Sequence, residues 1–134
     1  MKNRINYIHM GPVFLDVGYT FHEAAYKAEM SRRKIKDFSA FVTEGAAATL
    51  HHFSGTEEDA PSVILCMKID YSWDLSTKVG LIAHEATHVM QACKKFMREV
   101  EAGSEFEAYT VHYVTQEIFK GYQKEQAAIS PLDV

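Results

Sequence analysis

The sequence predicts a single α+β domain in which a short β-hairpin or sheet packs on a central helix and on a second helix that follows it. Two patterns carry this prediction. Strand-forming residues fill 38–53 and 62–70, on either side of a turn-rich loop, and apolar residues recur at helical spacing over 76–97 and 104–120. At 134 residues, 47% of them hydrophobic, the chain has the size of one domain with a buried core. No linker divides it, so we expect one domain over 1–134.

A first amphipathic helix is predicted over 20–36. Thr20, followed three residues later by Glu23, has the pattern of a capping box at a helix start. The helix would end in the basic run Ser31-Arg32-Arg33-Lys34. Because this is the densest basic cluster in a chain of net charge −4, we expect no nucleic-acid partner.

The two predicted strands, 38–53 and 62–70, are expected to form a hairpin around the loop at 54–61. The second strand is an almost continuous apolar run, as expected where both faces of a sheet are covered. His51 and His52 stand at the end of the first strand, beside an acidic loop. We interpret both histidines as surface residues.

The segment 76–97 is apolar on nearly all its faces, which predicts a helix through the middle of the fold. A loop centred on Ala102-Gly103 precedes the second long helix, and 123–134 is expected to form a short helical turn and a frayed end. The apolar stripes that predict the two helices are Ile82, Ala86, Val89, Cys93 and Phe96 for the first and Ala108, Val111, Thr115, Ile118 and Tyr122 for the second.

The cysteines and the apolar runs also indicate the cellular compartment. Cys66 and Cys93 lie in separate apolar segments without C-x-x-C spacing, which favours two buried free thiols in a reducing cytosol. No apolar run approaches the roughly 20 residues of a transmembrane helix. The N-terminal residues contain no hydrophobic core of a signal peptide. We expect a cytoplasmic protein with no membrane partner, and its oligomeric state is open.

The central helix carries His84-Glu85-Ala86-Thr87-His88, an H-E-x-x-H motif. Residues four apart lie one turn apart on one helix face, so both imidazoles can reach one Zn²⁺ ion. Glu85 can then act as the general base that takes a proton from the attacking water. In the alternative interpretation, His84 and His88 are core histidines and Glu85 is a surface charge, but two buried imidazoles would need two separate partners.

A catalytic zinc site usually has a third protein ligand. Glu105 and Glu107 are the candidates, and on a helix they point in nearly opposite directions, so at most one can face the metal. Ser104 and Glu107 form a capping-box pattern, which gives Glu107 a role at the helix start. Ala108 would let this helix approach the central one closely. We therefore favour Glu105 and keep Glu107 as the alternative.

The run from His84 to Gln91, followed by Glu105-Phe106-Glu107-Ala108-Tyr109, resembles the small HExxH zinc metallopeptidases of phage and prophage genomes and, more distantly, the gluzincins. The resemblance covers about residues 40–116. It implies a small zincin-like domain with His84, His88 and Glu105 as zinc ligands and Glu85 as the general base. Gluzincins carry an acid where this chain has Tyr109, so the carboxylate that orients a ligand histidine there has no counterpart.

The resemblance implies a zinc-dependent metallopeptidase acting on a peptide or protein, in the host cytoplasm if the chain is phage-encoded. One strand, 62–70 or 40–50, would be the exposed edge along which an extended peptide binds. Tyr109, His112 and Tyr113 are candidates for stabilising an oxyanion, although plain packing fits each equally well. The alternative function is a non-catalytic zinc-binding interaction protein, such as a phage effector or an inactive protease-like module.

Overall fold

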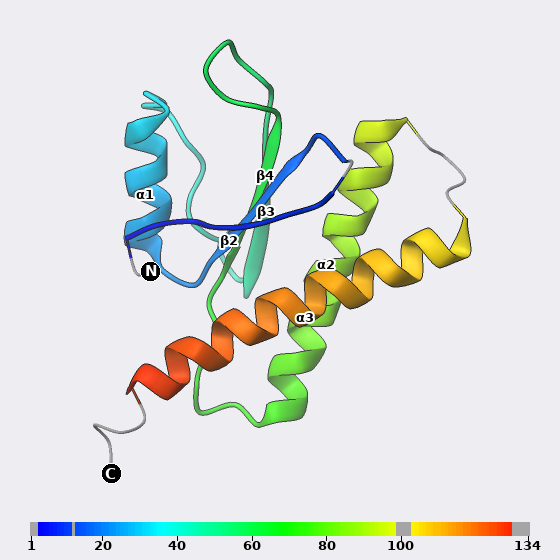
Figure 1. Ribbon diagram of the computed structural model, residues 1–134. Helices are drawn as coiled ribbons and strands as arrows, with labels where there is room; N and C mark the ends of the chain where they lie inside the picture. Colours follow the sequence, from blue (N-terminus) through cyan, green and yellow to red (C-terminus); the bar gives the residue numbers. More distant parts are fainter. Residues whose placement is uncertain (1–2, 12, 99–102, 130–134) are drawn as a thin grey trace.

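The computed structural model describes residues 3–11, 13–98 and 103–129, which form an α+β domain with a four-stranded sheet and three helices (Figure 1). This confirms the predicted α+β class. In chain order the elements are β1 (Asn6–Ile8), β2 (Asp16–Thr20), α1 (Glu23–Arg32), β3 (Ala48–Phe53), β4 (Ser62–Met67), α2 (Leu75–Met97) and α3 (Ser104–Ile129).

The sheet has the strand order β1-β2-β4-β3. β3 and β4 form the predicted antiparallel hairpin, but both strands are shorter than the predicted 38–53 and 62–70. β2 runs parallel to β4 and antiparallel to β1. Neither β1 nor β2 is predicted from the sequence. Gly18 is a poor strand former by itself, but a Cβ there would lie 2.5 Å from Ile5 Cγ2 and 3.0 Å from the ring of Tyr7. Close packing of β1 on β2 therefore favours glycine at this position.

The first helix begins later than predicted. Thr20 is the last residue of β2, and its hydroxyl accepts a hydrogen bond from the backbone N–H of His22 at 3.1 Å. His22 is the N-cap residue of α1 and makes no side-chain capping bond. The predicted capping box of Thr20 and Glu23 is wrong, because pairing with β4 draws Thr20 into the sheet.

Helices cover both faces of the sheet. Alternate residues of β4 point in opposite directions: Val63, Leu65 and Met67 join the core beneath α2 and α3, while Ile64 and Cys66 join a second core beneath α1. All six residues of β4 are buried. The continuous apolar run in this strand therefore has the predicted cause, cover on both faces.

Helix α2 begins within one residue of its predicted start and ends at the predicted residue. Asp74 caps its N-terminus by accepting a hydrogen bond from the backbone N–H of Thr77 at 2.8 Å. Arg98 ends the helix in the left-handed conformation, with φ of 60°. The predicted stripe is buried from Ile82 to Cys93, but Phe96 is 39% exposed.

Helix α3 crosses α2 and extends nine residues beyond the predicted 120 (Figure 1). At one end of the crossing, Lys94 of α2 forms an ion pair with Glu107 of α3. At the other end, the Lys78 ammonium lies 5.1 Å from the ring centre of Tyr122. Tyr122 is buried, which stabilises the last turns of α3 where the sequence predicted a short turn and a frayed end. Residues 130–134 lie outside the described residues.

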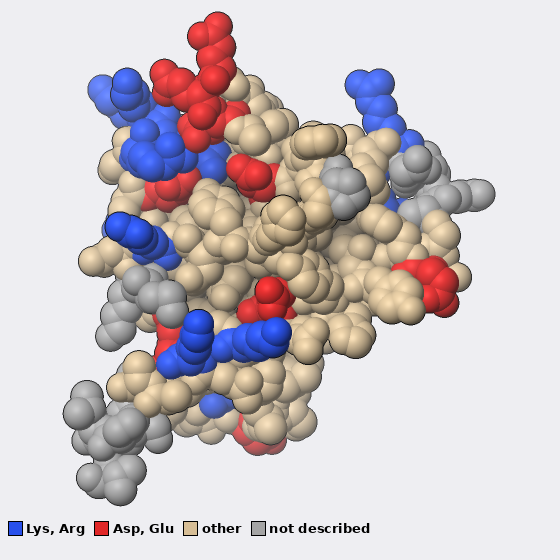
Figure 2. Space-filling view, viewed as in Figure 1, with Lys and Arg blue, Asp and Glu red and all other residues tan. Residues whose placement is uncertain are grey.

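The basic run at the end of α1 is engaged with carboxylates. Glu29 accepts hydrogen bonds from Arg32, from Arg33 and from the Tyr7 hydroxyl, at 2.8 to 2.9 Å. Arg32 also reaches Asp59 on the loop between β3 and β4. Figure 2 shows the two signs of charge side by side at this end of the molecule. Burial alone would raise the pKa of Glu29, but the bonds from Arg32, Arg33 and Tyr7 outweigh it and lower the pKa to about 2.

The two cysteines are buried free thiols, as predicted. Burial raises the pKa of Cys66 to about 12 and that of Cys93 to about 11, so both remain protonated at neutral pH. Among the described residues, no helix combines the length and the apolar character needed to cross a membrane.

Candidate metal centre

His84 and His88 lie one turn apart on α2, and their rings converge. The two Nε2 atoms are 3.2 Å apart, and the ring planes stand at 78° to each other. Two ligands that each bind zinc at 2.0 to 2.1 Å, in tetrahedral geometry, are separated by about 3.3 Å. The observed separation therefore fits chelation of one zinc ion by this pair.

Gln91, one turn beyond His88, orients its ring. The Nδ1 atom of His88 lies 3.0 Å from Oε1 of Gln91. An amide oxygen only accepts hydrogen bonds, so Nδ1 must carry the ring proton when this bond forms. The tautomer that results leaves a lone pair on Nε2, which is the form that binds a metal.

Exposure of the motif contradicts the interpretation of two core histidines. The His84 side chain is 67% exposed and His88 is also exposed, whereas the Glu85 side chain is only 11% exposed. Oε2 of Glu85 lies 3.9 Å from Nε2 of His84. A largely buried carboxylate next to two accessible imidazoles is the arrangement expected if Glu85 serves the metal-binding face.

The motif faces a cavity of about 680 Å³ between α2 and the segment 43–50. His84, Glu85 and His88 line one wall, and the start of β3 lines the other. A tight turn shapes the second wall: the N–H of Ala46 donates to the carbonyl of Thr43 at 2.9 Å, and Gly45 supplies the φ of 83° that the turn requires.

β3 is the edge strand of the sheet next to this cavity, and β4 is an inner strand. The sequence left the edge open between 62–70 and 40–50. The structure assigns it to the first of the two hairpin strands, which occupies Ala48–Phe53.

The structure places Glu105 on the exposed first turn of α3, and Glu107 one half-turn later in its ion pair with Lys94. Lys94 lies six residues, or about 9 Å of helix rise, beyond His88. Among the described residues, no three His, Cys, Asp or Glu side chains gather as a metal-binding group. The third ligand, Glu105 with Glu107 as its alternative, therefore stays a prediction.

Ala108 is exposed and does not make the close helix contact predicted for it. The contact of α3 with the core falls later, at Val114 and Ile118. The buried face of α3 is therefore rotated slightly about the helix axis from the predicted stripe, in which Val111 and Thr115 are only partly buried.

The three candidates for oxyanion stabilisation lie on the exposed surface of α3. Tyr109 is 68% exposed and His112 is exposed. The hydroxyl of Tyr113 donates to the carbonyl of His9 at 2.7 Å, which ties α3 to the segment after β1. Their role in stabilising an oxyanion stays a prediction.

Of the two histidines predicted to lie at the surface, His51 is buried and His52 is exposed. His51 is 8% exposed, stacks on Tyr26, and places Nε2 2.9 Å from the carbonyl of Phe41, so its assignment to the surface is wrong. His52 is exposed, as predicted. Neighbouring strand residues point to opposite faces, and the register of β3 on β4 directs His51 toward α1.

Gln91 had no predicted role, although its spacing of three residues from His88 places the two side chains on one helix face. The spacing alone does not show which ring nitrogen of His88 the Gln91 side chain contacts.

Comparison of the chain with protein-family models, with curated proteins and with solved structures finds no match.

Proposed function

We propose that this chain is a small zincin-like, zinc-dependent metallopeptidase of the HExxH type, as its resemblance to gluzincins implies. The observation that carries the proposal is the convergence of the two Nε2 atoms to 3.2 Å on one helix face. The ligands are His84 and His88, with Glu105 as the proposed third. Gln91 supports the proposal, because it holds His88 in the tautomer that binds a metal.

When bound, zinc would polarise the peptide carbonyl and lower the pKa of the attacking water. Glu85 takes the proton of that water and then delivers it to the departing amine nitrogen. Such general acid–base transfer contributes typically ~10² to 10⁴-fold to a rate. The small exposed fraction of Glu85 favours this role, because little competing water reaches its carboxylate.

The peptide substrate binds in extended form along β3. As the edge strand, β3 presents backbone N–H and C=O groups on the side away from β4. A peptide added there pairs with the strand whose first residues face His84 and His88 across the cavity. Backbone pairing then places a scissile carbonyl over the histidine pair.

The test is zinc-loaded wild type against Glu85→Gln on a library of unstructured peptides, with a chelator control for contaminating proteases. We expect cleavage by wild type and a loss of at least ~100-fold in the variant, since the amide keeps the shape but accepts no proton. Zinc content and melting temperature should be nearly unchanged. Equal cleavage by both proteins would show that Glu85 is not the base.

Metal content is a separate measurement. Elemental analysis after dialysis should give about one zinc per chain, and His84→Gln with His88→Gln should remove it. His9→Gln, which changes an exposed histidine after β1, is the matched control and should retain the metal. One tightly bound zinc with no cleavage of any peptide would favour the alternative function, a non-catalytic zinc-binding interaction protein.

A further inference from the structure

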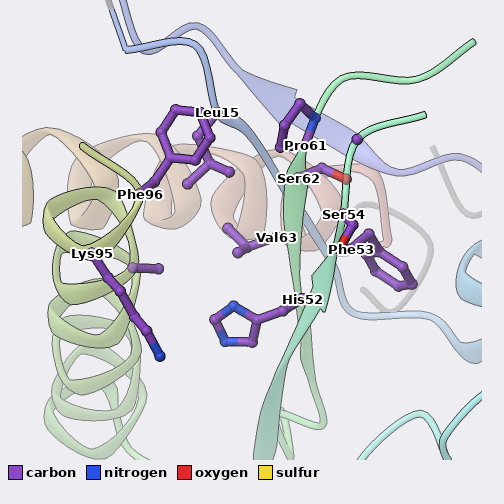
Figure 3. A pocket seen from close by; sticks show the side chains of 11 residues that line it. Leu15, His52, Phe53, Ser54, Pro61, Ser62, Val63, Lys95 and Phe96 are labelled. Atoms are coloured by element: carbon purple, nitrogen blue, oxygen red, sulfur yellow. The ribbon is translucent and has the colours of Figure 1, made fainter. Parts of the chain in front are cut away.

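A second cavity, of about 550 Å³, lies between the C-terminal half of α2 and the end of the β3–β4 hairpin. Figure 3 shows Lys95 of α2 and His52 of β3 directed toward the space between the two elements. Leu15, Val63, Ala92 and Phe96 supply apolar walls. Among the described residues that line this cavity, Lys95 and His52 are ionisable and none is a carboxylate. The lining of this cavity therefore carries a positive charge from Lys95, whereas a neighbouring cavity that His52 also lines contains Glu57, Glu58 and Asp59.

This cavity and the metal-site cavity lie between the same two elements. Lys95 is seven residues beyond His88, which places both on one face of α2 with about 10.5 Å of helix rise between them. On the opposite wall, His52 follows Leu50 by two residues and so projects from the same face of β3. A peptide held along β3 from the histidine pair would reach Lys95.

The charges around His52 indicate which chemical group this cavity can bind. Burial, and after it the positive charge of Lys95, lowers the pKa of His52. The neutral form of His52 therefore predominates at pH 7, and Lys95 supplies the positive charge among the described residues of the lining. An anion between the two side chains would pair with the Lys95 ammonium and favour protonation of His52, which gives two charge-assisted hydrogen bonds.

We propose that the cavity between His52 and Lys95 is a specificity subsite that binds a carboxylate of the peptide substrate. This inference rests on the proposed peptidase function. An extended chain advances about 3.3 Å per residue, so the 10.5 Å between His88 and Lys95 corresponds to about three residues. The carboxylate belongs to an Asp or Glu side chain, or to the chain terminus, about three residues from the cleaved bond.

Binding is tested first on the metal-free protein, so that the result does not depend on catalysis. The probes are three N-acetylated hexapeptides built on the same uncharged residues: one with a single Glu and an amidated C-terminus, one without Glu but with a free C-terminal carboxylate, and a neutral one with neither. The readout is the imidazole signal of His52 by NMR, assigned with His52→Gln. We expect at least one carboxylate probe to bind about tenfold more tightly than the neutral probe and to raise the pKa of His52.

Comparison of the first two probes identifies the source of the carboxylate. Lys95→Gln should abolish the preference for the carboxylate probes. Lys95→Arg keeps the positive charge and should retain this preference. Lys124→Gln, which removes an exposed positive charge near the C-terminal end of α3, is the matched control and should leave the preference unchanged. Equal binding of all three probes, no response of His52, or a preference that survives Lys95→Gln would each overturn the subsite.

Cleavage is tested second, with zinc-loaded protein and peptides that carry Glu or Gln at successive positions. The expected kcat/KM is about tenfold higher for Glu at one position near the third residue from the cleaved bond, and equal for Glu and Gln in Lys95→Gln. If no peptide is cut while the carboxylate probes still bind, the peptidase proposal fails and the anion site stands. If peptides are cut without preference for Glu or for a free terminus, the peptidase stands and the subsite is wrong.

Discussion

Nδ1 of His88 lies 3.0 Å from Oε1 of Gln91, one turn further along the same face of α2. This contact selects the His88 tautomer whose Nε2 directs its lone pair toward His84, with the two Nε2 atoms at 3.2 Å, within hydrogen-bond distance. Gln91 supplies an acceptor from the motif helix itself.

Replacement of Gln91 by Leu should weaken zinc binding by ~10 to 100-fold, because His88 loses the acceptor that fixes its tautomer and ring orientation. Competition with a metal-sensing dye measures the affinity. Gln116→Leu, at an exposed glutamine of α3, is the matched control and should bind zinc as wild type does. Equal affinity in both variants would show that the contact does not orient the ligand.

Glu105→Ala should lose zinc affinity far more than Glu107→Ala. The reason is that Glu107 is already paired with Lys94, away from the motif, and loss of a partly exposed ion pair costs only about 0 to 1 kcal/mol of unfolding free energy. Zinc titration and urea denaturation of both variants separate the two effects. Release of zinc by Glu107→Ala alone would make Glu107 the ligand.

Acidification should destabilise the fold through Glu29. Its pKa falls from 4.5 to about 2 on folding, so the unfolded chain binds the proton more readily between these values. The stabilisation is complete above about pH 5, amounts to about 3 kcal/mol at pH 7, and is lost as the pH falls toward 2. Urea denaturation at pH 7 and pH 3 should show a smaller difference for Glu29→Gln than for wild type, while the exposed Glu23→Gln keeps the wild-type difference.

Gly121→Ala should destabilise the protein although alanine favours helices. A Cβ at Gly121 would collide with the hydroxyl of Tyr19, which is 7% exposed and has little room to move. We expect a loss of about 1 to 3 kcal/mol in the free energy of unfolding. Gly80→Ala, on α2, where an added Cβ would meet no atom beyond its own stretch of helix within 4 Å, should instead gain about 0.5 to 1 kcal/mol. Thermal denaturation of the two variants makes the comparison.

The sequence by itself determined the elements whose pattern is local. The 3.6-residue period predicted α2 to within one residue at its start, and the apolar run with its turn-rich loop predicted the β3–β4 hairpin. The four-residue spacing of His84 and His88 placed both rings on one helix face, because helix geometry alone fixes that relation. The core face of α2 followed from the same periodicity.

Tertiary structure alone decided the relations between segments distant in the sequence. β2 contains Asp and Gly and becomes a strand through pairing with β4, a partner more than 40 residues away. The register of β3 on β4 directs His51 into the core beneath α1 and His52 toward Lys95. A strand's period of two specifies that neighbours differ in face, but only the covering helices determine which face is buried and which one meets a charge.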